Sequence, residues 1–131
     1  MTLTRSDILP KNDRPLISVD VPEWGGAVFV RSMSGHDRDS LESGMIELDG
    51  SRNMENFRGR LAVRVVCDES GERIFADEDA DAVGKKSAAA LDRIVSAAAP
   101  LNRLGSAQVA ELGNVSGGTQ SAASGSASPA I

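Results

Sequence analysis

The stretch that decides the fold is "VPEWGGAVFVR", residues 21–31. Before it, apolar and polar residues alternate over residues 17–21, which is typical of a half-buried strand. A second β-rich run occupies residues 27–31. The connection, residues 22–26, has a proline that fixes φ and two glycines that tolerate positive φ. The sequence therefore predicts a β-hairpin, and it must lie against helices because an isolated hairpin is marginally stable.

The helix after this hairpin begins with a capping signal. Ser34 and Asp37 have the S-x-x-D spacing, in which the hydroxyl and the carboxylate bind free backbone N–H groups. Leu41, Met45 and Leu48 follow at helical spacing. The pattern predicts a helix that continues to the Asp-Gly pair directly after Leu48.

Three further helices complete the expected fold. Residues 51–67 carry an apolar stripe that includes Phe57, with arginines on its flanks. The pattern over residues 68–84 predicts a turn, a short extended segment and a short acidic helix that ends at a glycine. A longer helix begins near Ser87, and Pro100 is expected to end or kink it because proline lacks the N–H donor. The expected inward-facing residues of that helix are Leu91, Ile94, Val95 and Ala98.

The 131 residues suffice for one domain. We expect a flexible segment at residues 1–14 and a single α+β domain at residues 15–112, in which an N-terminal β-hairpin packs on a small helical bundle. Residues 113–131 are rich in Gly, Ser and Ala and carry no charge. Such a segment cannot bury enough apolar surface to offset its ordering entropy, so we expect a disordered tail.

The composition excludes several classes of protein. A net charge of −5 argues against nucleic acid as the main partner, because phosphate binding needs a basic face. The single cysteine excludes an internal disulfide and fits a reducing cytoplasm. No apolar run approaches the ~20 residues that a membrane helix needs, and the N-terminus lacks the apolar core of a signal peptide. We therefore expect a soluble intracellular protein.

No motif for catalysis or metal binding is found. His36 and Cys67 are the only residues of their types, too few for a zinc site. Residues 77–81 place acids at alternate positions, as a calcium loop does, but Ala82 and Ala88 stand where that loop needs Gly and Glu. His36 has no nucleophile nearby in sequence. We expect no metal, no cofactor and no enzymatic activity.

Charge is distributed unevenly along the chain. Residues 52–64 hold four arginines and one glutamate, whereas residues 68–81 hold seven acids and one arginine. The simpler interpretation is two solvated faces. The alternative is that the basic patch of one copy meets the acidic run of the next, giving head-to-tail self-association. The candidate partner-binding residues on these patches are Arg60, Arg64, Asp77 and Asp79.

Two apolar residues are also candidates for partner binding. Trp24, the only tryptophan, lies in the expected hairpin turn. It is either a core plug that leans onto the helices or a docking anchor for a partner or a neighbouring copy. Met45 has the kind of adaptable side chain that is common in promiscuous binding grooves, although core packing is the simpler role.

These pieces in this order resemble the tail assembly chaperones of long-tailed bacteriophages. The resemblance covers residues 20–114, and it is carried by Pro22-Glu23-Trp24-Gly25-Gly26, the Arg38-Asp39 pair, and Gly71 through Phe75 with the acids that follow. The matching segments are "VPEWGGAVFVRSMSGHDRDSLE", "VCDESGERIFADEDADAVGKKSAAALDRI" and "PLNRLG". One departure is Asp37, where the family pattern has the longer Glu.

The resemblance implies a non-catalytic protein of the host cytoplasm that is absent from the mature virion. Members of the family bind the tape measure protein, keep it soluble and help recruit tail tube subunits. Many exist in two forms, the longer made by a ribosomal frameshift, and this chain would be the short form. Two alternatives stay open: a small structural tail or connector protein retained in the virion, and an enzyme using His36 with the clustered acids.

Overall fold

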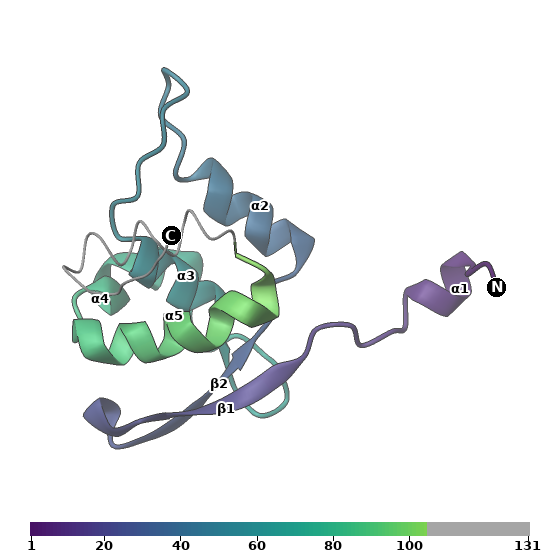
Figure 1. Ribbon diagram of the computed structural model, residues 1–131, viewed down its shortest axis with the longest axis horizontal. Helices are drawn as coiled ribbons and strands as arrows, with labels where there is room; N and C mark the ends of the chain where they lie inside the picture. Colours follow the sequence, from purple (N-terminus) through teal and green to yellow (C-terminus); the bar gives the residue numbers. More distant parts are fainter. Residues whose placement is uncertain (105–131) are drawn as a thin grey trace, which may run out of the picture.

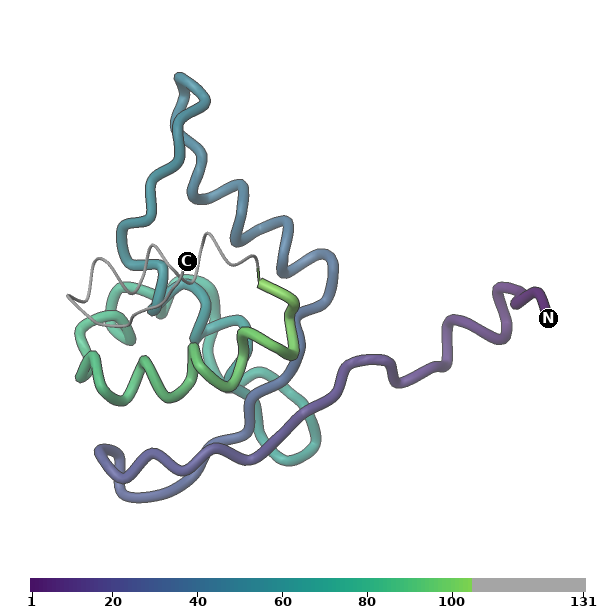
Figure 2. Tube along the Cα trace, in the orientation of Figure 1, coloured from purple at the N-terminus to yellow at the C-terminus, as the bar shows by residue number. Residues whose placement is uncertain are grey.

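The computed structural model describes residues 1–104, and it confirms the expected α+β fold (Figure 1). The N-terminal segment leaves the body as an extended arm with one short helix, α1 (Arg5–Ile8), none of whose residues is buried. Figure 2 shows this arm and a second projection between α2 and α3. The last part of the expected domain, residues 105–112, and the expected tail at residues 113–131 lie outside the described residues.

The predicted hairpin is confirmed. Strands β1 (Leu16–Val21) and β2 (Gly26–Arg31) pair antiparallel, with Val21 opposite Gly26. A single 3₁₀ turn, η1 (Pro22–Trp24), connects them, and Gly25 follows at a φ of 79°. That positive φ is readily available to glycine, which explains the sequence of the connection.

A third strand was not expected. Strand β3 (Val66–Cys67) pairs with β2, so the sheet order is β1-β2-β3. The prediction of helix up to Cys67 is wrong here, because Val66 turns to extended backbone and ends α3. A buried two-residue strand has no alternation by which the sequence could reveal it. Cys67 is buried as expected, and this burial raises the pKa of its thiol.

Helix α2 (Gly35–Ser43) begins as predicted but ends early. The Asp37 backbone N–H donates to Ser34 Oγ at 3.1 Å, which confirms the cap. The helix stops at Ser43, and residues 45–53 form instead a small antiparallel hairpin that we call the finger. Its backbone bonds join Asn53 to Met45 and Glu47 to Ser51. The finger reverses at Gly50, whose φ is 86°.

Helix α3 (Phe57–Val65) is the central helix, and it starts six residues later than predicted because residues 51–53 belong to the finger. The short acidic helix is confirmed as η2 (Asp77–Asp79) and α4 (Ala80–Gly84). Helices α3 and α4 pack closely around Asn56, whose Nδ2 donates to the Ala80 carbonyl at 2.9 Å.

Helix α5 (Ala88–Asn102) lies along the hairpin (Figure 1). The helix begins near Ser87 as expected, and Ser87 Oγ caps it by accepting from the Ala90 N–H at 3.2 Å. Of the two effects expected of Pro100, the end of the helix is wrong, because the helix continues to Asn102. A proline in the last turn removes only one helical bond, and the Asn102 side chain accepts from Met33 N and donates to the Ala98 carbonyl.

The core lies between the sheet and the helices. Phe57 is its largest fully buried side chain, as expected. The inward-facing residues predicted for the last helix are all buried. The core is mainly aliphatic, and its members include Val30, Leu41, Met45, Leu61, Val63, Val83, Leu91, Ile94 and Ala98.

Candidate partner-binding surfaces

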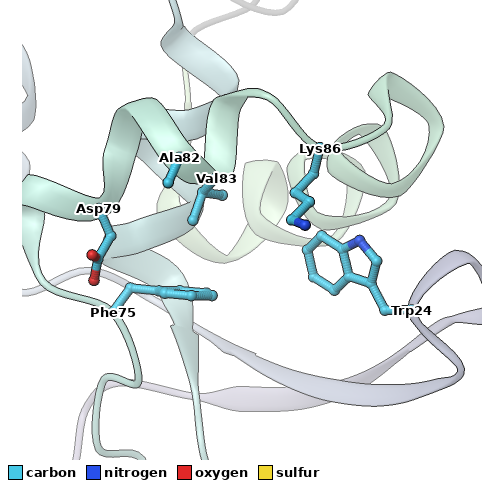
Figure 3. Close-up of a pocket in the computed structure, with 6 residues that line it drawn as sticks. All are labelled: Trp24, Phe75, Asp79, Ala82, Val83 and Lys86. Carbon is cyan, nitrogen blue, oxygen red and sulfur yellow. The ribbon is translucent and has the colours of Figure 1, made fainter.

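Trp24 lies at a surface depression of about 520 Å³ between the hairpin turn and α4. The indole is half-buried and packs against the edge of the core. Figure 3 shows the Phe75 ring below Val83 of α4, and the Trp24 ring to its right, beside the end of the Lys86 side chain. Trp24 therefore packs on the core, as the core-plug alternative expected, and it also borders an open apolar depression.

The two edges of this depression carry opposite charges. Lys86 extends toward the Trp24 ring at one edge, and Asp79 lies at the other, beside Phe75 (Figure 3). Asp79 Oδ2 also accepts from the Ala76 backbone N–H at 2.8 Å, which caps the turn that leads into α4. The site can hold an apolar group and orient it by a charge at each edge.

The predicted basic and acidic patches meet inside one molecule. Arg64 is buried on α3, and its Nη2 lies 3.3 Å from Asp77 Oδ2. Arg73 Nη2 approaches the other oxygen of Asp77 at 2.7 Å. Hydrogen bonding from Arg73 holds the pKa of Asp77 below its usual value, whereas burial lowers the pKa of Arg64.

This network ties α2, α3 and η2 together. Arg73 Nη1 reaches Asp37 Oδ1 at 3.5 Å, and Arg64 Nη2 donates to Ser40 Oγ at 3.1 Å. Arg60 Nη1 donates to the Gly44 carbonyl at 2.9 Å, so this guanidinium is also engaged within the chain. The expectation of solvated flanks is wrong for Arg64, because its aliphatic stem is packed in the body.

Met45, the remaining sequence candidate, is only 1% exposed and belongs to the core. Its position at the base of the finger explains why it is covered: α2 has ended and the chain turns back over α3. The side chain thus contributes packing and offers no surface to a partner in this fold. Of the six candidates, only Trp24 and Asp79 line the depression.

A second depression of about 580 Å³ lies between β1 and α5. We call it the β1–α5 groove. Strand β1 is an edge strand of the sheet, and Ile17 and Val19 face the groove from it. The facing side of α5 presents small side chains, which allow another helix to approach closely. These small residues are Ala89, Ser96 and Ala97.

Two charged residues of α5 also line the groove, and in the helix they lie between Ala89 and Ser96. The first, Arg93, donates from Nε and Nη2 to the two carboxylate oxygens of Glu23 at 2.9 and 3.2 Å, which fixes the hairpin turn to α5. This hydrogen bonding lowers the pKa of Glu23. The second, Asp92, is held by Arg58 Nε at 2.6 Å. A preformed groove whose charged residues are already paired can bind a chain segment without rearrangement.

The sequence had indicated α5 only as a core helix, and its outer face was missed. A stripe of alanine and serine carries no chemical signal, because the same residues occur on any solvated helix. Lys86 and Phe75 were likewise not among the candidate partner-binding residues, since only the fold brings them to Trp24. The exposure of Leu48 on the finger was missed because this residue matched a helical spacing.

The described residues give no further chemical site. Over residues 1–104, no group of three or more His, Cys, Asp or Glu side chains is placed to hold a metal ion. His36 is exposed in the first turn of α2. Within the same residues, no helix has both the length and the apolar character required to span a membrane.

Comparisons with known proteins give one family match and one similar fold. A family model described as "Phage tail assembly chaperone" matches residues 16–114. The structure of the tail assembly chaperone of bacteriophage HK97 matches with a TM-score of 0.53 at 23% identity, covering 67% of this chain and 85% of that one. This second likeness concerns the fold. No curated protein matches the chain.

Proposed function

The chain belongs to the phage tail assembly chaperone family, and we propose that it binds the tape measure protein, keeps it soluble and helps recruit tail tube subunits during assembly. It acts as a non-catalytic protein in the host cytoplasm, self-associates, and leaves before the virion is complete. It needs no cofactor, nucleic acid or membrane. The family match over residues 16–114, which spans the whole folded body, is the observation that carries this proposal.

The β1–α5 groove is the surface we assign to the tape measure protein. A long helical protein that awaits its tube exposes apolar stripes, and a groove floored by Ala89, Ser96 and Ala97 accepts such a helix at close range. The groove is shallow, so each contact is weak. Many copies along one helix would then bind by avidity and still release when tube subunits arrive.

Co-expression with the tape measure gene of the same genome tests this assignment. We expect the tape measure protein in the soluble fraction only when this chain is present. Ser96→Arg, which fills the groove from an exposed position, should abolish this effect. Ser43→Arg, an equally exposed change at the end of α2, is the matched control and should retain it. An insoluble tape measure protein in the presence of the unmodified chain would refute the proposal.

The alternative, a structural tail or connector protein, differs in where the chain ends up. A chaperone leaves the particle, whereas a connector stays in it in fixed number. Quantitative mass spectrometry of purified virions distinguishes the two, and we expect the chain to be absent from particles but abundant in infected cells before lysis.

A further inference from the structure

The finger presents two aliphatic side chains to solvent on an ordered projection. Leu48 is fully exposed and Ile46 is 57% exposed. Leu48 lies in the turn of the finger, which the bond from the Gly50 N–H to the Glu47 carbonyl closes, and Ile46 lies two residues before it, at the bridge to Arg52. We call these two exposed side chains the apolar tip of the finger. The tip is held in place by side-chain bonds as well as the backbone: Asn53 Nδ2 donates to Glu47 Oε2 at 2.7 Å, and Ser51 Oγ donates to Asp49 Oδ1 at 2.6 Å.

The finger cannot reach the depression of its own chain. Figures 1 and 2 show it projecting from the body on the side opposite the β1–β2 hairpin, whose turn carries Trp24. The fold thus presents a rigid apolar knob on one side and an open apolar depression on the other.

From this arrangement we infer that the finger of one copy docks into the Trp24 depression of a second copy. The depression, at about 520 Å³, has room for more than one aliphatic side chain. Leu48 enters between Trp24 and Phe75, over Val83. The inference rests on the self-association included in the proposed function, and it names the two surfaces that make the contact.

Charge complementarity favours a second copy as the occupant. Glu47 and Asp49 flank Leu48 in the sequence, and the depression has Lys86 at its edge, with exposed Lys85 beside it. Within residues 1–104 Lys86 forms no ion pair, so its ammonium group is available to these acids.

A second pair of charges matches in the same way. Arg52, on the returning strand of the finger, is exposed and forms no ion pair within the described part of the chain. Asp79 lies at the other edge of the depression. Glu47 and Asp49 of the finger therefore pair with Lys86, and Arg52 pairs with Asp79 at the opposite edge. These two pairings set the orientation of the finger in the depression.

Because the two partners use different surfaces, the contact is heterologous. Such contacts repeat head to tail and give a ring or an open chain. Each added copy brings another β1–α5 groove, which multiplies the weak sites available to one long helix.

Sedimentation velocity over a range of protein concentrations tests the inference. We expect the unmodified chain to assemble, and Leu48→Asp on the finger and Ala82→Glu in the depression each to weaken assembly about tenfold or more. Both positions are exposed, so circular dichroism should show unchanged folding. Leu3→Asp, another exposed leucine on the N-terminal arm, is the matched control and should assemble normally.

Mixing the two variants gives a sharper result. Leu48→Asp retains a functional depression and Ala82→Glu retains a functional finger, so the mixture should form a dimer that cannot grow. Asp49→Lys and Lys86→Glu should each weaken assembly, and the combination should restore it. A monomeric unmodified chain, or variants that assemble as well as it does, would overturn the inference.

The tape measure co-expression assay separates this inference from the proposed function. If the Leu48→Asp variant assembles normally, and the unmodified chain makes the tape measure protein soluble, the docking contact is wrong and the chaperone role stands. If assembly depends on the finger and the depression as expected but the tape measure protein stays insoluble with the unmodified chain, the docking contact stands and the chaperone role fails.

Discussion

Two hairpins within residues 1–104 are built alike but differ in how much apolar surface they bury. The β1–β2 hairpin and the finger both pair antiparallel and both use a glycine at positive φ, Gly25 at 79° and Gly50 at 86°. The first buries Val21 and Val30 completely, whereas the second leaves Leu48 in solvent. Turn chemistry shapes both hairpins, but only apolar burial makes one of them part of the body. The other leaves Ile46 and Leu48 exposed to solvent.

Two leucines give the largest test of this comparison. Leu41 is 2% exposed in the core, and Leu48 is fully exposed on the finger. We expect Leu41→Ala to lower the free energy of unfolding by about 2–5 kcal/mol, because it removes buried methyl groups and leaves a cavity. Leu48→Ala should change it by less than about 0.5 kcal/mol. Urea unfolding measures both, and similar losses would mean that the finger packs on the body.

Two asparagines give a test of intermediate size. The Asn102 side chain is buried and accepts the Met33 backbone N–H, which anchors the residues after β2 to the end of α5. Asn102→Leu should cost about 1–3 kcal/mol of stability, because that N–H is left without a partner. Asn53→Leu removes the finger's bond to Glu47 and should cost less than about 0.5 kcal/mol. Equal urea midpoints for the two variants would contradict the conclusion that the Asn102 bond stabilises the body more than the Asn53 bond does.

The sequence predicted the elements whose signals are local. The hairpin, the Ser34 cap, the short acidic helix and the start of the last helix near Ser87 depend on neighbouring residues only, and all of them are found. The finger was predicted as helix because Leu41, Met45 and Leu48 fit a helical spacing. Two of the three are core residues, and the spacing itself cannot reveal that the third faces solvent after the helix has ended.

The candidate site depended on contacts between distant residues, and these could not be predicted. Arg64 and Asp77 were both singled out for their charge, but their pairing within one chain appears only when α3 and η2 pack together. Trp24 was recognised as unusual because of its position in a turn. Its neighbours Phe75 and Lys86 come from segments about 50 and 60 residues away, and no sequence pattern connects them.

Acid titration gives the smallest and most selective test. Glu23 in the hairpin turn accepts two bonds from Arg93 of α5, and this lowers its pKa in the folded chain. A carboxylate with a lowered folded pKa stabilises the fold above its unfolded pKa, about 4.3 for Glu, and loses this contribution as the pH falls through the folded value. Glu23→Gln should therefore be less stable than the unmodified chain at pH 7, with the difference shrinking toward pH 3.

Asp49 in the finger is the matched comparison. Its pKa is also lowered, but by hydrogen bonds from Ser51, only two residues away. Such a local turn can form without the rest of the fold, so the folded and unfolded chains share much of the shift. Asp49→Asn should leave the pH dependence of the urea midpoint nearly unchanged. If it flattened that dependence as much as Glu23→Gln, the finger would be coupled to the stability of the body, and its apolar tip would not be free to serve a second copy.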